Sequence, residues 1–306
     1  MHFTLLYLDN WRSGYYMRLF TSIILTTLLL AGCNESGGDS GNSGSTKSFS
    51  LESSSEIRGN VAGDYAKASG TYTYRRPGYS TSNASVILEE TNSYGGVNTI
   101  IKSTSQRVTD KSTGDISQSV SQDYYSKKNG LEYHTFTQGI DDNFYAVNAL
   151  NGLADFTEFL INNGSFSTYY TYDTCSSYET EICSNRNQVA TVSASYTNIG
   201  IETIETPLGR FQAYKIKAAL TRTSNDTNAF SNISSSGTAW FYPSFGFVKQ
   251  EFTTQFNDYS PAITMDATLT VDETNISRFS RKKAQQNHLP QLAFLRTIEL
   301  PKEIIK

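Results

Sequence analysis

Apolar and polar residues alternate along most of this chain, and the alternation is cleanest near Ile263. Between Ile263 and Val271 every apolar residue falls on one parity and every polar residue on the other. Successive side chains of a strand point to opposite faces, so this period of two predicts a half-buried β-strand and excludes a helix. Less strict alternation predicts further strands in Ala84–Glu90, Val97–Val108, Gln188–Tyr196 and Phe211–Leu220.

Two short turns predict hairpins between neighbouring strands. The turn at 206–209 (Thr-Pro-Leu-Gly) joins the segment 199–205 to a strand that carries Tyr214 and Ile216. The turn at 243–246 (Pro-Ser-Phe-Gly) joins 238–242 to 247–256. Pro and Gly stand where tight turns use them, because Pro presets one backbone angle and Gly tolerates the left-handed region. Consecutive hairpins of this kind make an antiparallel meander.

One helix is expected to interrupt the meander, between Asn151 and Asn163. Asn151 is a suitable N-cap and Gly164 can end the helix, while an apolar stripe is formed by Leu153, Phe156, Phe159 and Leu160. A large antiparallel sheet with one wet face curls, and such a helix can plug its concave side. The predicted fold is therefore all-β and mainly antiparallel, a large curved sheet or half-barrel with one plugging helix.

Composition supports a single β-rich domain, which we place at residues 48–277. The chain has 306 residues, 38% of them hydrophobic, and includes 20 Tyr and 17 Phe. Aromatic and β-branched residues suit pleated, half-buried surfaces. After Arg278 the pattern dissolves into a basic tail, residues 278–306, which we expect to be disordered or loosely docked. Contact of this tail with anionic head groups or with a partner is the alternative.

The first 32 residues carry the features of an export signal. Counted from Met17, which we take as the true start, a positive residue (Arg18) precedes an apolar run over 19–30. This run is too short to span a bilayer comfortably and closes in small residues. The sequence Leu-Ala-Gly-Cys at 30–33 resembles the lipobox of bacterial lipoproteins. That resemblance implies cleavage before Cys33 and acylation of its thiol, with palmitate among the attached lipids.

Residues 33–47 form a predicted tether, which links the lipid to the folded domain. They are nearly all Ser, Gly, Asn and Asp after Cys33, a composition that behaves as a flexible coil. In the sorting pattern that the lipoprotein resemblance implies, Asn34 in place of Asp favours the outer membrane. We therefore expect an outer-membrane lipoprotein of the cell envelope, exposed at the periplasmic face or the cell surface.

The other two cysteines, Cys175 and Cys183, lie close together in a polar stretch and are predicted to form a disulfide. Such a bond requires an oxidising compartment, which agrees with export. A zinc site is the alternative, but it would need more Cys or His than the three histidines of this chain supply. We therefore predict neither a metal nor a cofactor.

Charge argues against nucleic acid as a partner. The formal net charge is −4, and the 278–306 tail is basic, so the body before it is clearly acidic. Binding to phosphates requires a basic face.

No catalytic signature survives inspection, so the chain is predicted not to be an enzyme. The protease-like motif Gly-Asp-Ser-Gly at 38–41 lies in the tether, where a coil cannot hold a base and oxyanion donors. His134 occupies an ordinary strand position, and Glu89 and Glu90 should point to opposite faces of a strand. Asp141-Asp142-Asn143 lacks the ligand spacing of a calcium loop.

Two segments carry a further resemblance. The segments Ile204–Ile216 and Trp240–Lys249 (Trp-Phe-Tyr-Pro-Ser-Phe-Gly-Phe-Val-Lys) resemble a recurrent turn and hairpin pairing in uncharacterised bacterial envelope lipoproteins. That family is similar in fold to the curved half-barrels of the lipoprotein-carrier (Lol) type. The resemblance covers about the second half of the body and implies a fold more securely than a function.

The aromatic residues are the candidate ligand contacts. Trp240 and Tyr242 share a strand face, and Tyr214, Phe156 and Phe159 complete the predicted site, although core packing would also explain them. We expect a non-enzymatic lipoprotein that binds an apolar ligand, such as a lipid, or an envelope protein in its curved sheet. An adhesin or envelope-assembly factor acting through an exposed Tyr/Thr-rich face is the alternative.

The lipid anchor can be tested directly. Growth with labelled palmitate should label the protein, and a Cys33→Ser variant should lose the label and leave the membrane fraction, because it lacks the acylated thiol. Ser36→Ala, in the same tether, serves as the matched control and should behave as the unaltered chain. Retention of the Cys33→Ser variant in the membrane would contradict the prediction.

Overall fold

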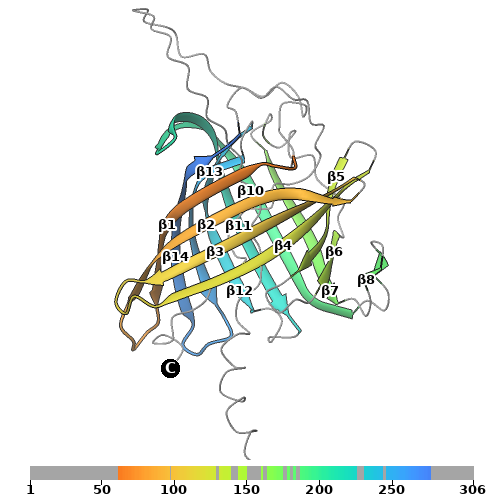
Figure 1. Ribbon diagram of the computed structural model, residues 1–306. Helices are drawn as coiled ribbons and strands as arrows, with labels where there is room; N and C mark the ends of the chain where they lie inside the picture. The colour runs from red at the N-terminus through yellow and green to blue at the C-terminus, as the bar shows by residue number, and fades with distance from the viewer. Residues whose placement is uncertain are drawn as a thin grey trace, which may run out of the picture.

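A closed antiparallel β-barrel forms the body of the protein (Figure 1). The computed structural model describes residues 61–276, apart from 97, 129–130, 139–143, 150–159, 161–163, 175–177, 180–181, 184–186, 226–230 and 244–245. Twelve strands close the barrel in the order β1-β14-β13-β12-β11-β10-β7-β6-β5-β4-β3-β2, and a separate two-stranded sheet joins β8 to β9.

The strands have the following bounds. In the first half of the chain lie β1 (Tyr65–Arg75), β2 (Ser82–Gly96), β3 (Thr99–Asp110), β4 (Ile116–Lys128), β5 (Leu131–Gln138), β6 (Phe144–Ala149) and β7 (Ser165–Thr174). The second half holds β8 (Tyr178–Glu179), β9 (Ile182–Cys183), β10 (Asn187–Thr206), β11 (Gly209–Ser224), β12 (Ile233–Tyr242), β13 (Gly246–Phe256) and β14 (Ile263–Thr274).

The all-β, antiparallel class is confirmed, but the expected half-barrel is wrong because the sheet closes on itself. Tyr72 of β1 pairs with Ala267 of β14 on one side and with Ala84 of β2 on the other. A strongly twisted sheet of this many strands curls until its first and last strands meet, and closure removes both exposed edges.

The predicted plugging helix falls almost wholly outside the described residues. Of the segment from Asn151 to Asn163, the structure describes Leu160, which is in helical conformation and buried in the hydrophobic core. Its carbonyl oxygen accepts a hydrogen bond of 2.8 Å from the buried Asn198 Nδ2 of β10. This contact ties Leu160 to a strand of the barrel.

The predicted strands and hairpins are confirmed where the structure describes them. The alternation that begins at Ile263 becomes β14, whose five apolar residues Ile263, Met265, Ala267, Leu269 and Val271 are all buried. Thr206 pairs with Gly209 in the hairpin of β10 and β11, and Tyr242 pairs with Gly246 in that of β12 and β13. Short turns therefore set the order of neighbouring strands.

A bulge in β10 turns its hairpin with β11 away from the barrel. The pairing shifts between Asn198 and Ile201, and Gly200 between them has a φ of 116°, a left-handed value that favours glycine. Beyond the bulge burial changes sides: Ile201 is 43% exposed although its partner Tyr214 is buried, whereas Ile204 is buried. Figure 1 shows this hairpin, in teal, curling beyond the barrel wall.

The two ends of the described chain lie together. Tyr65 donates its backbone N–H to Asn275 Oδ1 at 2.8 Å, and Asn275 Nδ2 donates to the Gly63 carbonyl at 2.8 Å. Since all neighbouring strands are antiparallel, this end of the barrel also holds the end of β2 and the hairpin of β10 and β11. The segments that lead to the predicted anchor and to the basic tail therefore leave the barrel at the same end.

Two glycines allow neighbouring strands to approach closely. A Cβ on Gly237 of β12 would collide with the backbone carbonyl oxygen of Glu251 on β13, and one on Gly70 of β1 with that of Thr268 on β14. Glycine within a strand often marks a place where another backbone comes close.

We therefore expect Gly237→Val to destabilise the barrel by about 3 kcal/mol or more, because a backbone carbonyl cannot move aside as a flexible side chain can. Ser236→Val, the neighbouring outward-facing position, is the control and should change stability by about 0.5 kcal/mol or less. Urea denaturation followed by circular dichroism measures both. Equal stability of the two variants would contradict the steric argument.

Candidate functional site

Polar side chains are unevenly distributed over the inward-facing wall of the barrel. Most of them lie on β2 to β5 and form a polar arc, which comprises Glu90, Asn92, Lys102, Thr104, Gln106, Ser119, Ser121, Asp123 and Thr137, although these strands also turn apolar residues such as Val86, Leu88 and Tyr125 inward. The remaining wall is mainly apolar, with Arg222, Ser235, Gln250 and Thr254 as buried polar exceptions, and its apolar arc comprises Ala68, Tyr72, Tyr170, Tyr172, Val192, Ala194, Tyr196, Tyr214, Ile216, Ala218, Leu220, Ala239, Phe241, Phe252, Met265, Ala267, Leu269 and Val271. The interior is therefore amphipathic.

The polar arc contains a buried ion pair. Lys102 Nζ lies 2.8 Å from Glu90 Oε2, and the two side chains are 0% and 3% exposed. Their backbones explain the meeting, because Asn92 pairs with Lys102 and Glu90 with Thr104 across neighbouring strands. Burial of a single charge would be costly, so the pairing allows both charged groups to stay inside the barrel.

Hydrogen bonds extend the polar arc to its neighbours. Thr137 Oγ1 donates to Asp123 Oδ1 at 2.8 Å. At the border with the apolar arc, Gln106 Nε2 donates to the hydroxyl of Tyr72 at 3.1 Å. Burial raises the pKa of that hydroxyl, so Tyr72 stays neutral and can accept the bond.

Three buried polar side chains of the inner wall have no hydrogen-bond partner among the described residues. They are the amides of Asn92 and Gln250, which lack partners at both the oxygen and the nitrogen, and the hydroxyl of Ser121. Asn92 is 5% exposed and Gln250 is 1% exposed. More than nine in ten buried polar groups in proteins are paired, so each of these marks a place that a ligand or a water would satisfy.

Gln250 is the most unusual of the three because its neighbours are apolar. It lies on β13 between Ala239 of β12 and Leu269 of β14, both buried. An unpartnered amide in such a place loses its hydration without compensation. One unpartnered polar side chain therefore lies on the apolar wall, apart from the polar arc.

The apolar arc includes one buried cation, Arg222 of β11. Its Nε donates to the Ser231 carbonyl at 2.8 Å, and burial lowers the pKa of Arg222 to about 10. Burial also raises the pKa of Tyr170 and of Tyr172, which pack edge to face at 5.6 Å between ring centroids. These tyrosines therefore stay neutral at physiological pH.

The size of the barrel and the small residues on its wall favour an occupied interior. Eight-stranded barrels can already enclose one small ligand, and the diameter grows with strand number, so twelve strands enclose more. Alanine occupies many inward positions, among them Ala68, Ala84, Ala190, Ala194, Ala218, Ala239 and Ala267. Such short side chains reach less far toward the axis than the tyrosines do.

The predicted ligand contacts that the structure describes, Trp240, Tyr242 and Tyr214, lie on two sides of the wall. Tyr214 is buried on the inner wall, whereas its strand neighbour Lys215 pairs with Trp240, so Trp240 lies on the outer side of the wall. Tyr242 shares that side and packs edge to face against Phe211 at 5.5 Å. Phe156 and Phe159 lie outside the described residues.

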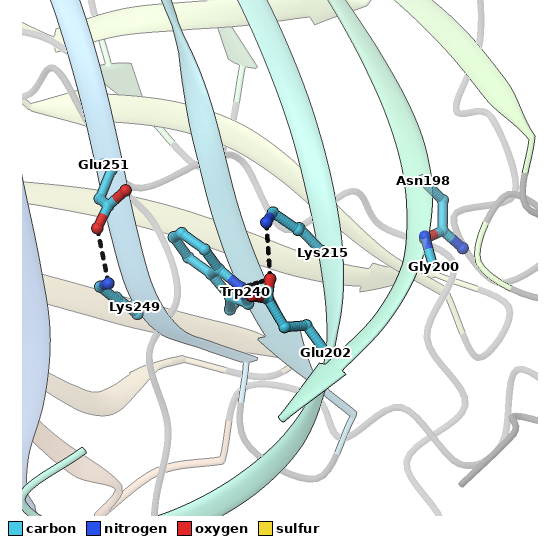
Figure 2. Close-up of polar contacts among 7 residues, drawn as sticks. All are labelled: Asn198, Gly200, Glu202, Lys215, Trp240, Lys249 and Glu251. Carbon is cyan, nitrogen blue, oxygen red and sulfur yellow. Dashed lines mark hydrogen bonds and ion pairs between the residues drawn. The ribbon is translucent and has the colours of Figure 1, made fainter. Parts of the chain in front are cut away.

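Trp240 is held beneath the hairpin of β10 and β11, as Figure 2 shows. Its Nε1 donates to Glu202 Oε2 at 2.9 Å, and Lys215 Nζ lies 2.7 Å from the same oxygen. Lys215 and Lys249 also stand over the indole ring, at 5.4 Å and 4.8 Å from its centre. The hydrogen bond of Lys215, and next that of Trp240, hold the pKa of Glu202 below its usual value. Trp240 thus clamps the hairpin to the wall.

The structure describes only some of the remaining residues that the sequence analysis singled out. Glu89 is exposed and Glu90 buried, which confirms that these two carboxylates do not converge. Cys183 lies on β9, where its backbone pairs with Tyr178, while Cys33, Cys175 and Asp141–Asn143 lie outside the described residues. Within the residues that the structure describes, no three His, Cys, Asp or Glu side chains gather as a metal site would need. The same residues include no helix that could cross a membrane.

The polar arc was missed in the sequence. Along β3 both parities carry polar residues, so Lys102, Thr104 and Gln106 look no more buried than Ser103, Ser105 and Arg107. Only the pairing of β3 with apolar positions of β2, such as Val86 opposite Val108, indicates which parity faces inward. On β4 the aliphatic residues point to the wrong parity, because Ile116 and Val120 are 52% and 55% exposed.

The fold and its interior define a closed antiparallel barrel with an amphipathic inner wall. No protein-family model and no curated protein matches the sequence. Several solved structures are similar to this chain in part. A Bacteroides fragilis protein predicted to be exported, with a YmcC-like fold, is 14% identical, is covered over 98% of its length against 71% of this chain, and has a TM-score of 0.31.

Two further structures are those of predicted lipoproteins. One from Parabacteroides distasonis is 12% identical, with 70% of this chain and 96% of that chain covered and a TM-score of 0.30. The hypothetical lipoprotein YmcC of Escherichia coli is 11% identical, with 67% and 83% covered and a TM-score of 0.30. Functional conclusions therefore rest on the residues of this chain.

Replacement of the unpartnered Gln250 should stabilise the protein. We expect Gln250→Leu to raise the free energy of unfolding of the ligand-free chain by about 1 kcal/mol, because a buried amide without partners is removed. Gln106→Leu is the matched control and should lower it by a similar amount, since it deprives the buried Tyr72 hydroxyl of its donor. Urea denaturation tests both, and destabilisation by Gln250→Leu would contradict the assignment.

Proposed function

We propose that this protein binds an amphiphilic molecule inside its barrel, with a hydrocarbon chain against the apolar arc and a polar end at the polar arc. The division of the inner wall into these two arcs is the observation that carries the proposal. Burial of a hydrocarbon chain against apolar side chains is favourable by about 25 cal/mol per Å² removed from water. A polar end needs hydrogen-bonding partners once it leaves water.

The unpartnered groups support a ligand over a wholly protein-filled interior. A barrel that needed only packing would be more stable with apolar residues in place of Asn92, Ser121 and Gln250. The lack of partners at Asn92 and Ser121 is explained if the polar end of a second molecule provides the missing hydrogen bonds. Ligand sites are typically apolar with a few placed polar groups, which matches this interior.

The binding role is proposed for the cell envelope, without catalysis. The support is the lipobox at Cys33 and the position of Asn34 after it, which favours the outer membrane. A curved antiparallel sheet with apolar residues inside suits the binding of acyl chains, and the two hairpin segments resemble envelope lipoproteins whose fold is similar to the lipoprotein-carrier half-barrel. The two ends of the described chain are joined at one end of the barrel, and the tether would leave from that end.

Native mass spectrometry of the full chain purified from its own membranes tests the proposal. We expect a bound amphiphile, and uptake of a fluorescent monoacyl lipid after the bound molecule is removed. Ala218→Phe, which faces the interior, should abolish both, because its ring takes the space of the chain.

Ala219→Phe is the matched control. Ala219 is the next residue of β11 and is exposed on the outer side, so this variant should bind as the unaltered chain does. Circular dichroism confirms that both variants fold. Absence of any bound or captured amphiphile in the unaltered protein would refute the proposal.

A further inference from the structure

The charges of the polar arc are already engaged within it. Lys102 is paired with Glu90 at 2.8 Å, and Asp123 accepts the hydroxyl of Thr137 at 2.8 Å. Two carboxylates therefore stand against one ammonium on this part of the wall. An anionic head group placed here would add a further buried negative charge, with no second buried cation among the described residues of the arc to oppose it, which is strongly unfavourable.

The free hydrogen-bonding capacity of the arc is neutral and of both kinds. Asn92 offers an unpartnered carbonyl oxygen and an unpartnered amide nitrogen, and Ser121 offers an unpartnered hydroxyl. The two residues flank the ion pair, because Asn92 lies opposite Lys102, and Ser121 lies opposite Thr104, the partner of Glu90. A primary amide can donate two hydrogen bonds and accept others, so Asn92 suits a partner that does both.

From these groups we infer that the polar arc is a subsite for an uncharged head group that donates and accepts hydrogen bonds, such as a fatty amide or the glycerol hydroxyls of a monoacylglycerol. This inference rests on the proposed function and specifies its ligand class. It assigns the Asn92 amide to the head group directly and the Ser121 hydroxyl to a second hydrogen bond.

Arg222 marks where a carboxylate would bind instead. It is a buried cation on β11, and in the order of strands around the barrel β11 lies across the interior from β2, β3 and β4. A fatty acid would therefore seek the opposite wall, beside Tyr170 and Tyr172. The identity of the preferred head group consequently reports which wall holds it.

Three probes that share the oleoyl chain separate these cases: oleamide, 1-monooleoylglycerol and oleate. Each displaces a fluorescent monoacyl lipid from the full chain in a competition titration. We expect oleamide and 1-monooleoylglycerol to bind about tenfold or more tightly than oleate, a ratio typical of one or two hydrogen bonds.

Asn92→Leu should weaken the binding of oleamide about tenfold and leave the affinity for oleate unchanged. Ser121→Ala should weaken the binding of the two neutral probes by a smaller factor. Thr91→Val is the control, since Thr91 is exposed on the outer side of the same strand. Unlike a loss of folding, the Asn92→Leu effect should accompany unchanged or raised stability to urea.

The possible outcomes distinguish failure of the head-group inference from failure of the proposed function. Tighter binding of oleate, with loss on Arg222→Gln, would overturn the inference and place the head group on the opposite wall. Equal binding of all three probes, or an Asn92→Leu variant that keeps the preference, would overturn it while leaving the proposed function intact. Binding of none of them would reject the proposed function itself.

Discussion

Closure of the sheet is the constraint on which the rest of this structure depends. Because β1 pairs with both β14 and β2, the sheet has no free edge, and every inward-facing side chain is enclosed by strands. A polar residue on that wall cannot turn to bulk water. The polar groups inside must form hydrogen bonds or ion pairs with each other or with a molecule that enters the barrel. Lys102 and Glu90 meet this condition by pairing, whereas Asn92 leaves it open.

Most of the hydrophobic core and the candidate polar ligand contacts lie on different parts of the barrel wall. Aromatic and aliphatic residues on β10 to β14 form most of the hydrophobic core, whereas the polar arc occupies β2 to β5. Outside the wall, Trp240 stabilises the folded-back hairpin by a hydrogen bond to Glu202 and by two flanking lysines. A buried Trp with a polar handle is a frequent ligand contact, but here its indole nitrogen is already used within the protein.

The bulge in β10 links these two regions. Gly200 allows the strand to reverse its burial, so residues before it, such as Asn198, face the interior and residues after it cover the outer wall. Asn198 also donates a hydrogen bond to the carbonyl of Leu160, the one described residue of the segment that was predicted to plug the sheet. One local irregularity thus positions both an interior contact and an external clamp.

The sequence by itself determined the β class, the antiparallel meander, strand β14 and the two hairpins, because strand alternation and turn chemistry are local properties. It also supported the prediction of a lipid anchor at Cys33, which rests on a short contiguous motif. Only the tertiary structure decided that the sheet closes, since the contact of β1 with β14 joins residues about two hundred positions apart. For the same reason the polar arc could not be predicted: alternation identifies two faces of a strand, but when both are polar, only the surrounding strands decide which face turns inward.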